Sequence, residues 1–351
     1  MHRRRLLQAG AAGLLAPAVP AMAQDALYVP PEEGPHTGTL MMWPASRRVH
    51  PDPVFLGMLQ RTIADIANTI AAFEPVYLLA DARHHGTMRK MTSADVTFWD
   101  IPTEDLWARD AGPLFAWQGD RQVISHIAFN GWGRKQVHDQ DGQVAQRVAD
   151  RLDVPVIASG VIGEAGGVEH DGHGLLMAHE SSWVIRNRNP GLSRDEVEAR
   201  LLTAYGADRM IWSRGVKGED ITDYHIDSLA RFTGPGRVLI NLPDRPDRDD
   251  PFHMAALDTH DALIAAGLDV DVIPEPNQRR VRSIDFVASY ANYYVCNGAI
   301  VAAQFGDREA DAIAVDALAR HYPKREIVTL NVDPLGEVGG GIHCATQQIP
   351  A

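Results

Sequence analysis

The chain has 351 residues, of which 45% are hydrophobic and 23% are charged, a composition typical of a soluble globular protein with an ample core. Its formal net charge of −13 argues against nucleic acid as a partner, because a strongly acidic protein repels phosphates. The same charge favours cationic partners, although net charge chiefly affects solubility.

The first 23 residues have the pattern of an export signal. Residues 3–5 are all arginine, residues 9–19 form a mildly apolar run, and residues 21–23 read AMA, a small-x-small cleavage site. The apolar run is shorter than the roughly 20 residues that span a bilayer. We therefore predict a twin-arginine signal peptide at residues 1–23, a single mature domain at residues 24–351, a periplasmic location and no membrane contact after cleavage. A frayed basic helix is the alternative.

After this segment, helical and extended patterns alternate along the chain without a linker. Apolar residues recur at helical spacing over residues 54–73, and a strand pattern follows at 76–79. Residues 193–196 read SRDE, a capping box that opens a helix. The other elements predicted by this alternation are a helix through residue 205 with a strand at 210–212, a helix at 252–266 with a strand at 270–273, and a helix at 308–322 with a strand at 327–332.

The alternation by itself predicts an α/β fold, and a doubly wound sheet is its simplest form. No glycine motif reads G-x-G-x-x-G between a strand and a helix, so the sequence does not favour a dinucleotide-binding fold. The residues contain no clean internal repeat. The pattern therefore gives the fold class without its finer architecture.

Four short segments carry acids, histidines and a cysteine, and three of them contain glycine. In chain order they are residues 107–113 (WARDAGP), 164–172 (EAGGVEHDG), 224–227 (YHID) and 339–348 (GGGIHCATQQ). The last segment places Cys344 among glycines and polar residues, which is typical of a displayed, reactive thiol. We interpret the third segment as a strand, in which the alternate residues His225 and Asp227 share a face.

The order and wording of these motifs resemble the agmatine deiminases and the bacterial type of peptidyl-arginine deiminase, members of the guanidine-modifying superfamily. The resemblance continues at Pro35-His36 and Trp43-Pro44 and covers essentially the whole mature chain. It implies an α/β propeller of five ββαβ units around a central axis, forming a single catalytic domain. It implies neither a metal nor a cofactor.

The resemblance also implies roles for particular residues. Cys344 is the expected nucleophile, His225 the general acid and base, and Glu164 the support for the histidine and the guanidinium. Asp110 and Asp227 are expected to clamp the planar guanidinium, which stays charged because its pKa exceeds about 12. Attack by a thiolate needs positive charge nearby, here the substrate or protonated His225.

Trp107 and Glu169 are two further candidates for substrate binding. Trp107 opens the W-x-R-D motif, and Glu169 lies in the segment of Glu164 and competes with it for the same role. Two positions depart from the family's pattern. Ala165 replaces a glycine, which we expect to be tolerated, and Glu33 replaces an aromatic residue in a segment expected near the substrate's tail.

The same residues have ordinary structural interpretations. Asp110 fits a turn or a salt bridge, and a His-x-Asp pair is often only a hydrogen-bonded strand end. Glu169, His170 and His173 have the residue types of metal ligands, but they lie in a glycine-rich loop and no other His or Cys pair has metal-ligand spacing. Cys296 lies in an aromatic, strand-like run, so we predict it to be buried and unpaired. A Cys296–Cys344 disulfide is the alternative.

The predicted activity is hydrolysis of a guanidinium C–N bond by covalent cysteine catalysis. Agmatine, giving N-carbamoylputrescine and ammonia, is the expected substrate; peptidyl-arginine or another guanidino compound is the alternative, and free arginine ranks third. A cysteine peptidase would have no use for two guanidinium-clamping carboxylates. A periplasmic binding protein for a cationic amine is the non-enzymatic alternative. The expected partner is a small cationic guanidino compound, and a homodimer is compatible with the sequence.

Overall fold

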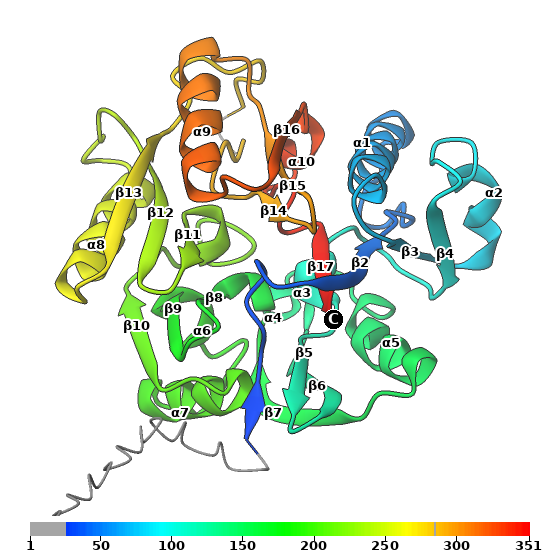
Figure 1. Cartoon of the computed structure of the whole chain (residues 1–351), viewed down its shortest axis with the longest axis horizontal. Helices are drawn as coiled ribbons and strands as arrows, with labels where there is room; N and C mark the ends of the chain where they lie inside the picture. Colours follow the sequence, from blue (N-terminus) through cyan, green and yellow to red (C-terminus); the bar gives the residue numbers. More distant parts are fainter. Residues whose placement is uncertain (1–25, 284–285) are drawn as a thin grey trace, which may run out of the picture.

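The computed structural model describes residues 26–283 and 286–351, so the predicted signal peptide at residues 1–23 lies outside the described residues. Within the described residues, the strands form five sheets of three or four strands each. Figure 1 shows these sheets distributed around the middle of the molecule, with helices between and outside them. The predicted α/β class is confirmed.

The sheets share one order of elements. β11 (Ala230–Gly234) pairs antiparallel with β12 (Arg237–Leu242), and α8 (Pro251–Ala265) then leads to β13 (Asp269–Pro274), which lies parallel to β12. The other units repeat this pattern: β5 (Phe115–Gln118), β6 (Arg121–Ala128), α5 (Val144–Leu152) and β7 (Val156–Ile162); β8 (Val168–His170), β9 (Leu175–His179), α7 (Arg194–Tyr205) and β10 (Arg209–Ser213); β14 (Tyr294–Val295), β15 (Ala299–Ala303), α9 (Arg308–His321) and β16 (Glu326–Leu330).

One further unit joins the two ends of the chain. β17 (Thr346–Pro350) pairs antiparallel with β2 (His36–Met42), and α1 (Pro53–Ala71) leads from β2 to the parallel strand β3 (Val76–Ala80). The short strand β1 (Leu27–Tyr28) and the strand β4 (Val96–Asp100) add edges to two of the sheets. Because β17 runs through the middle of Figure 1, the residues that precede it also lie near the centre.

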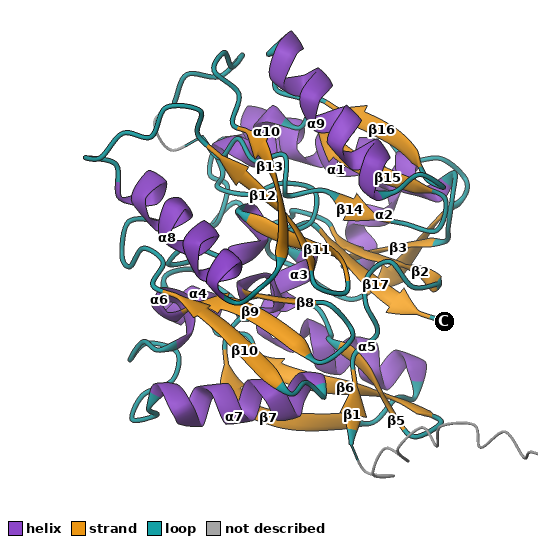
Figure 2. Cartoon of the chain, turned by 60° about the vertical axis from the view of Figure 1, so that its left-hand side comes forward, coloured by secondary structure: helices purple, strands orange, loops and turns teal. Residues whose placement is uncertain are grey.

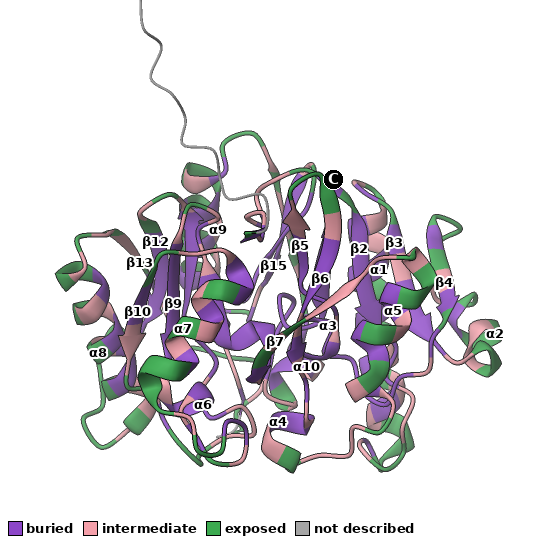
Figure 3. Cartoon of the chain, turned by 90° about the horizontal axis from the view of Figure 1, so that it is seen from below, coloured by how far each residue is buried: buried purple, intermediate pink, exposed green. Residues whose placement is uncertain are grey.

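The long helices begin where local signals place them. Asp52 accepts a hydrogen bond from the Val54 backbone N–H ahead of α1, and Ser193 and Glu196 form the predicted capping box of α7. Figure 2 shows α7, α8 and α9 on the outside of the strands that they connect. In Figure 3 these helices carry exposed residues outward while the strands are mostly buried. The predicted helix and strand pairs beginning at residues 54, 193, 252 and 308 are confirmed.

Three local predictions need correction. Residues 224–227 do not form a strand: Asp223 and Tyr224 have φ of 59° and 68°, and a 3₁₀ turn (Ile226–Ser228) follows. The left-handed backbone breaks the extended conformation there. Asp110, which the following Gly112 and Pro113 predict to lie at the end of a strand or loop, lies in a one-turn helix, α3 (Ala108–Ala111). The expected strand around Cys296 is reduced to β14, although its neighbours are buried.

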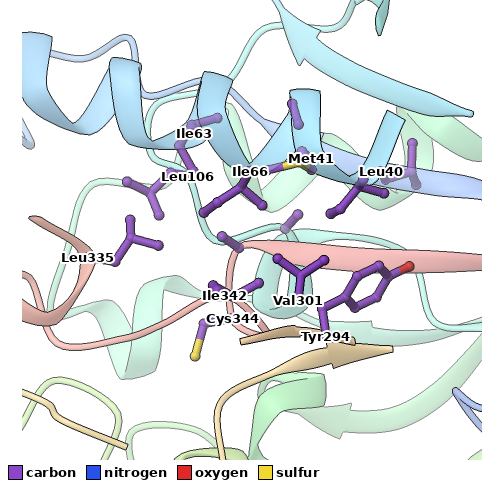
Figure 4. Packing of buried hydrophobic residues seen from close by; sticks show 14 of the residues in the cluster. Leu40, Met41, Ile63, Ile66, Leu106, Tyr294, Val301, Leu335, Ile342 and Cys344 are labelled. Carbon is purple, nitrogen blue, oxygen red and sulfur yellow. The ribbon is translucent and has the colours of Figure 1, made fainter. Parts of the chain in front are cut away.

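The largest apolar cluster packs α1 against the strands of its own and neighbouring units. Figure 4 shows Leu40, Ile66 and Val301 in this cluster, and Cys344 at its edge with the sulfur directed away from them. No helix within residues 26–283 and 286–351 has both the length and the apolar character to span a bilayer.

Candidate active site

Cys344 lies in the turn that leads into β17, and its side chain is only 7% exposed. The expectation of an openly displayed thiol is therefore wrong. The glycines before it serve close packing: a Cβ on Gly340 would lie 2.5 Å from the Trp107 ring, and one on Gly341 would lie 2.5 Å from Asn292 Oδ1. The glycine run thus brings the cysteine between two neighbouring side chains.

The Cys344 sulfur has two polar partners. Its thiol lies 3.3 Å from Asp227 Oδ2, which accepts from it, and Asn292 Nδ2 donates to it from 3.1 Å. The structure therefore brings together Cys344 and Asp227, two of the predicted residues, although 117 positions separate them in the sequence. Trp107 lies beside the same turn, as its contact with Gly340 shows.

His225 and Glu164 form a second pair. His225 Nε2 lies 3.1 Å from Glu164 Oε2, and both side chains are buried. Arg188, which is completely buried, donates through Nε to both oxygens of Glu164 and through Nη1 to Asp223 at 2.7 Å. The Arg188 guanidinium thus fixes Glu164, which in turn contacts His225. The role of Glu164 as the support for His225 stays a prediction.

Asp110 has one oxygen engaged and one without a hydrogen bond. Trp132 Nε1 donates to Oδ2 from 2.8 Å. Oδ1 is buried, lies 3.7 Å from His225 Nδ1, and accepts no hydrogen bond from any described residue. A buried carboxylate oxygen without a donor is costly, and it is suited to accept an N–H group from a ligand.

The functional groups converge on the open side of Gly166. A Cβ built on this glycine would lie 2.7 Å from Asp110 Oδ1, 3.0 Å from His225 Nδ1 and 3.2 Å from Asp227 Oδ2. The three atoms therefore face one small region, which only a glycine leaves open. The predicted residues Asp110, His225 and Asp227 thus come from distant segments to a single site.

The charges of this site shift one another's protonation. Burial raises the pKa of Asp110 to about 6, with Glu164 and Asp227 adding to the rise and His225 opposing it. Burial alone lowers the pKa of His225, but Asp110 and Glu164 outweigh it and raise that pKa to about 9. Burial, reinforced by Asp227 and Asp110, raises the pKa of the Cys344 thiol well above its usual value. Near neutral pH the free site therefore holds an imidazolium and a thiol.

A second buried group of charges adjoins the site through His343. His343 Nδ1 lies 2.7 Å from Asp227 Oδ2, and its Nε2 lies 3.1 Å from Glu32 Oε2. Glu32 also accepts from Arg109 at 2.7 Å and from Arg231 at 3.1 Å. Although burial raises the pKa of Asp227, His343 and His225 outweigh it and lower that pKa. We call Glu32, Arg109, Arg231, Glu169 and His343 the ion-pair cluster.

Glu169 belongs to this ion-pair cluster and not to the group around Gly166. Arg231 Nε lies 2.8 Å from Glu169 Oε1, and the Phe232 backbone N–H donates to Oε2 from 3.3 Å. Its role in substrate binding stays a prediction. Glu33 lies on the same side, within 3.4 Å of the Tyr322 hydroxyl, and burial raises its pKa to about 7.

The two cysteines are both free and buried. The Cys296 thiol lies 3.4 Å from the Ala299 carbonyl oxygen, and burial raises its pKa to about 12. The prediction of a buried, unpaired Cys296 is confirmed. Within residues 26–283 and 286–351, no group of three His, Cys, Asp or Glu side chains is arranged to hold a metal ion.

Sequence reasoning missed several residues that build this site. No role was predicted for Asn292, Arg188 or Trp132, although the segments of Arg188 and Trp132 belong to the family resemblance. Their positions follow from contacts between distant segments. His343 could have been predicted from the sequence, because it adjoins Cys344 in the motif already singled out.

Comparisons with known proteins show the family of the chain. The sequence pattern of Porphyromonas-type peptidyl-arginine deiminases matches residues 28–350. A Streptomyces coelicolor protein, provisionally named an agmatine deiminase, is 32% identical over 335 residues, which cover 92% of this chain and 98% of that protein.

Solved structures extend the comparison. The agmatine deiminase of Enterococcus faecalis superposes with a TM-score of 0.82 at 25% identity, covering 93% of this chain and 96% of that one. A cysteine-to-serine variant of C. jejuni agmatine deiminase with substrate bound has the same fold, with a TM-score of 0.84, 22% identity, and 93% and 96% coverage. The chain therefore belongs to the Porphyromonas-type peptidyl-arginine deiminase family, which includes the agmatine deiminases, and is a hydrolase of that type.

Proposed function

We propose that the protein hydrolyses a guanidinium C–N bond, with agmatine as the substrate and N-carbamoylputrescine and ammonia as the products. The observation that carries this proposal is the convergence of Asp110 Oδ1, His225 Nδ1 and Asp227 Oδ2 on Gly166, with Cys344 3.3 Å from the same Asp227 oxygen. Agmatine is favoured because relatives at 32% and 25% identity carry the name of agmatine deiminase.

The two aspartates are suited to clamp a guanidinium. Asp110 Oδ1 is a buried acceptor without a donor among the described residues. A guanidinium has N–H groups arranged as a planar fork, and it stays charged at any ordinary pH. Its charge offsets the two carboxylates that raise the pKa of Cys344, so substrate binding favours the thiolate. The thiol proton leaves to solvent at this stage.

In the first chemical step the Cys344 thiolate attacks the guanidinium carbon, forming a C–S bond. His225, which is protonated in the free site, transfers its proton to one NH₂ group. The bond from carbon to that nitrogen breaks, and ammonia leaves. The product of this step is a thiouronium cation on Cys344 beside a neutral His225. The released thiol proton and the ammonia together give ammonium.

In the second step His225 acts as a base. It takes a proton from water, and the oxygen of that water bonds to the thiouronium carbon. The C–S bond then breaks, the hydroxyl proton returns to the sulfur, and the ureido product leaves. Glu164 keeps the imidazole oriented through both steps, because it is itself fixed by Arg188.

Three further predictions belong to the same proposal. We propose that the five sheets are the blades of a propeller whose axis passes through the site, since each unit has the order strand, strand, helix, strand. We propose that residues 24–351 form one catalytic domain. We also propose export to the periplasm by the twin-arginine pattern at residues 1–23. Protection of the protein from added protease in intact spheroplasts would contradict this export.

The activity is tested by ammonia release from agmatine, free arginine and a short arginine peptide. Cys344→Ala is compared with Cys296→Ala, since each removes one buried, free thiol. We expect turnover of agmatine, loss of about 10⁴-fold or more in Cys344→Ala, and native turnover in Cys296→Ala. Binding of agmatine should persist in Cys344→Ala, because both aspartates remain.

The three substrates separate the alternatives. Turnover of only the peptide would keep the chemistry and move the function to deimination of peptidyl-arginine. Binding of agmatine without ammonia release from any of the three compounds would support a binding protein. Ammonia release at the native rate by Cys344→Ala would contradict covalent cysteine catalysis.

A further inference from the structure

Asn292 contacts the nucleophile, and no step of the mechanism above uses it. The residue lies before β14, is 2% exposed, and reaches Cys344 across 52 positions of sequence. Its Nδ2 donates to Cys344 Sγ from 3.1 Å. The backbone of Asn292 is fixed as well, because its carbonyl oxygen accepts from the His343 N–H at 3.2 Å.

The orientation of the Asn292 amide is decided by its other partners. The Cys344 backbone N–H can only donate, and it lies 3.3 Å from Oδ1, so the oxygen must face that side. The NH₂ group must then face Cys344 Sγ, Ser228 Oγ at 3.2 Å and the Asp227 carbonyl oxygen at 3.4 Å. A reversed amide would place donor against donor. The orientation of the amide thus places the NH₂ group against the sulfur, the nearest of its three neighbours.

The two partners of the sulfur respond in opposite ways when the thiol ionises. Asp227 Oδ2 accepts from the thiol, and two negative charges would face each other once the proton leaves. The Asn292 N–H becomes a charge-assisted donor at that moment, and such hydrogen bonds are roughly twice as strong as neutral ones. In agreement, burial, Asp227 and Asp110 raise the pKa of Cys344, whereas the Gly341 backbone and the Asn292 side chain lower it.

We propose that Asn292 is a catalytic residue whose Nδ2–H group stabilises the Cys344 thiolate, both when it attacks the guanidinium carbon and when it leaves that carbon after water has added to the thiouronium. The part of this proposal that concerns turnover rests on the proposed function. The stabilisation itself is a property of the free protein, because every contact named lies within the chain.

The test is the rate at which iodoacetamide alkylates Cys344 in the absence of substrate, followed between about pH 7 and 10. Mass spectrometry separates Cys344 from Cys296. In Asn292→Ala we expect alkylation about tenfold slower at a given pH. A tenfold smaller thiolate population corresponds to a thiol pKa that is higher by about one unit. Asn292→Asp keeps an oxygen for the Cys344 N–H and replaces the donor by a charge, so its rate should fall further.

Asn189→Ala is the matched control. Asn189 is also buried, at 5% exposure, and it makes three hydrogen bonds with backbone groups of Ile162 and Trp183, none with the sulfur. A merely structural role predicts similar losses in both variants. We expect the alkylation rate of Asn189→Ala to stay within about twofold of native. If Asn292→Ala does not fold by circular dichroism, Asn292→Asp decides the question.

Alkylation of Asn292→Ala and Asn292→Asp within about twofold of native would overturn the proposal. Ammonia release measured beside it separates the two proposals. Slower alkylation in a protein that releases ammonia from no guanidine would support the thiolate donor and remove the proposed function. If both variants kept the native alkylation rate and the native turnover of agmatine, the proposed role of Asn292 would be wrong and the proposed function would remain.

Discussion

Two buried groups of charges meet at Asp227. They shift the pKa of a buried carboxyl side chain in opposite directions. In the ion-pair cluster, burial would raise the pKa of Glu32, yet Arg231, Arg109 and His343 hold it well below its usual value. In the candidate active site, burial dominates and raises the pKa of Asp110 to about 6.

The difference lies in the donors. Glu32 accepts from two arginines, from His343 and from the Val295 backbone N–H, so its charge is compensated. Asp110 accepts only from Trp132 among the described residues, and its second oxygen faces the site. A buried carboxylate with a full set of donors has its charge compensated, and removing it destabilises the fold because its partners lose their counter-charge. One that lacks donors costs stability and keeps its affinity for a cationic ligand.

Asp110→Asn should have the largest effect and should separate activity from stability. Loss of one clamping charge is expected to lower kcat/KM for agmatine by about 10³-fold. The folded-state pKa of about 6 lies above the unfolded value, so ionisation costs stability as pH rises from about 4 through 6. The variant should therefore be more stable than native by about 3 kcal/mol at pH 8. The difference should vanish near pH 4.

Urea unfolding at both pH values measures the stability effect of Asp110→Asn, and ammonia release measures its effect on activity. Equal stability of native protein and variant at pH 8 would show that donors reach Asp110 in solution. Unchanged kcat/KM would remove Asp110 from the clamp.

Glu32→Gln should destabilise the fold, since it leaves Arg109 and Arg231 short of their shared carboxylate. Removing one partner of a buried ion pair costs about 3–5 kcal/mol. The control is Glu33→Gln, the adjacent glutamate, whose pKa burial raises to about 7. That change should be stabilising at pH 8, by an amount similar to that of Asp110→Asn, because the charged form of Glu33 is disfavoured in the fold. Urea unfolding measures the free energy of unfolding of both variants. Similar losses of stability in the two would contradict the difference between compensated and uncompensated carboxylates.

His343→Gln tests whether the two groups are coupled. His343 bridges Asp227 and Glu32 through its two ring nitrogens, whereas glutamine can donate to only one of these carboxylates. Losing a charged hydrogen bond to Asp227 should lower kcat/KM by roughly 10- to 100-fold. His50→Gln is the control, because His50 pairs with Asp105 at 2.7 Å outside the site. If both variants kept native kcat/KM, the ion-pair cluster would be a structural neighbour only.

The pH dependence of kcat/KM is the smallest expected effect. Asp110 must be ionised to clamp the guanidinium, so activity should fall as pH drops below about 6. His225 must be protonated to release ammonia, so activity should fall above about 9. Asp110→Asn should lose the acidic limb, and its alkaline limb should move below about 9, because the Asp110 charge contributes to the raised pKa of His225. An alkaline limb near the ordinary histidine value, about 6.5, would contradict the coupling of His225 to Asp110 and Glu164.

Much of the secondary structure could be predicted because its signals are local. The capping box at Ser193 and Glu196 sets the start of α7, and apolar spacing marks α1. The extended interpretation around His225 failed, because two non-glycine residues, Asp223 and Tyr224, adopt positive φ. Such a conformation is stabilised by contacts elsewhere, here the hydrogen bonds from Lys135 and Arg188 to Asp223.

The sequence by itself determined the α/β class, the long helices, the family, and the identity of the residues predicted for the chemistry. Residue type and motif order suffice for these, because helix caps, apolar periodicity and the choice of thiol, imidazole or carboxylate are written within a few positions. Only the tertiary structure decided that Cys344 is buried and that Glu169 joins the ion-pair cluster. It also decided that Asn292 and His343 contact the reacting groups. These facts depend on packing between segments 50 to 120 positions apart, where burial and donor supply, and not residue type, set how each side chain behaves.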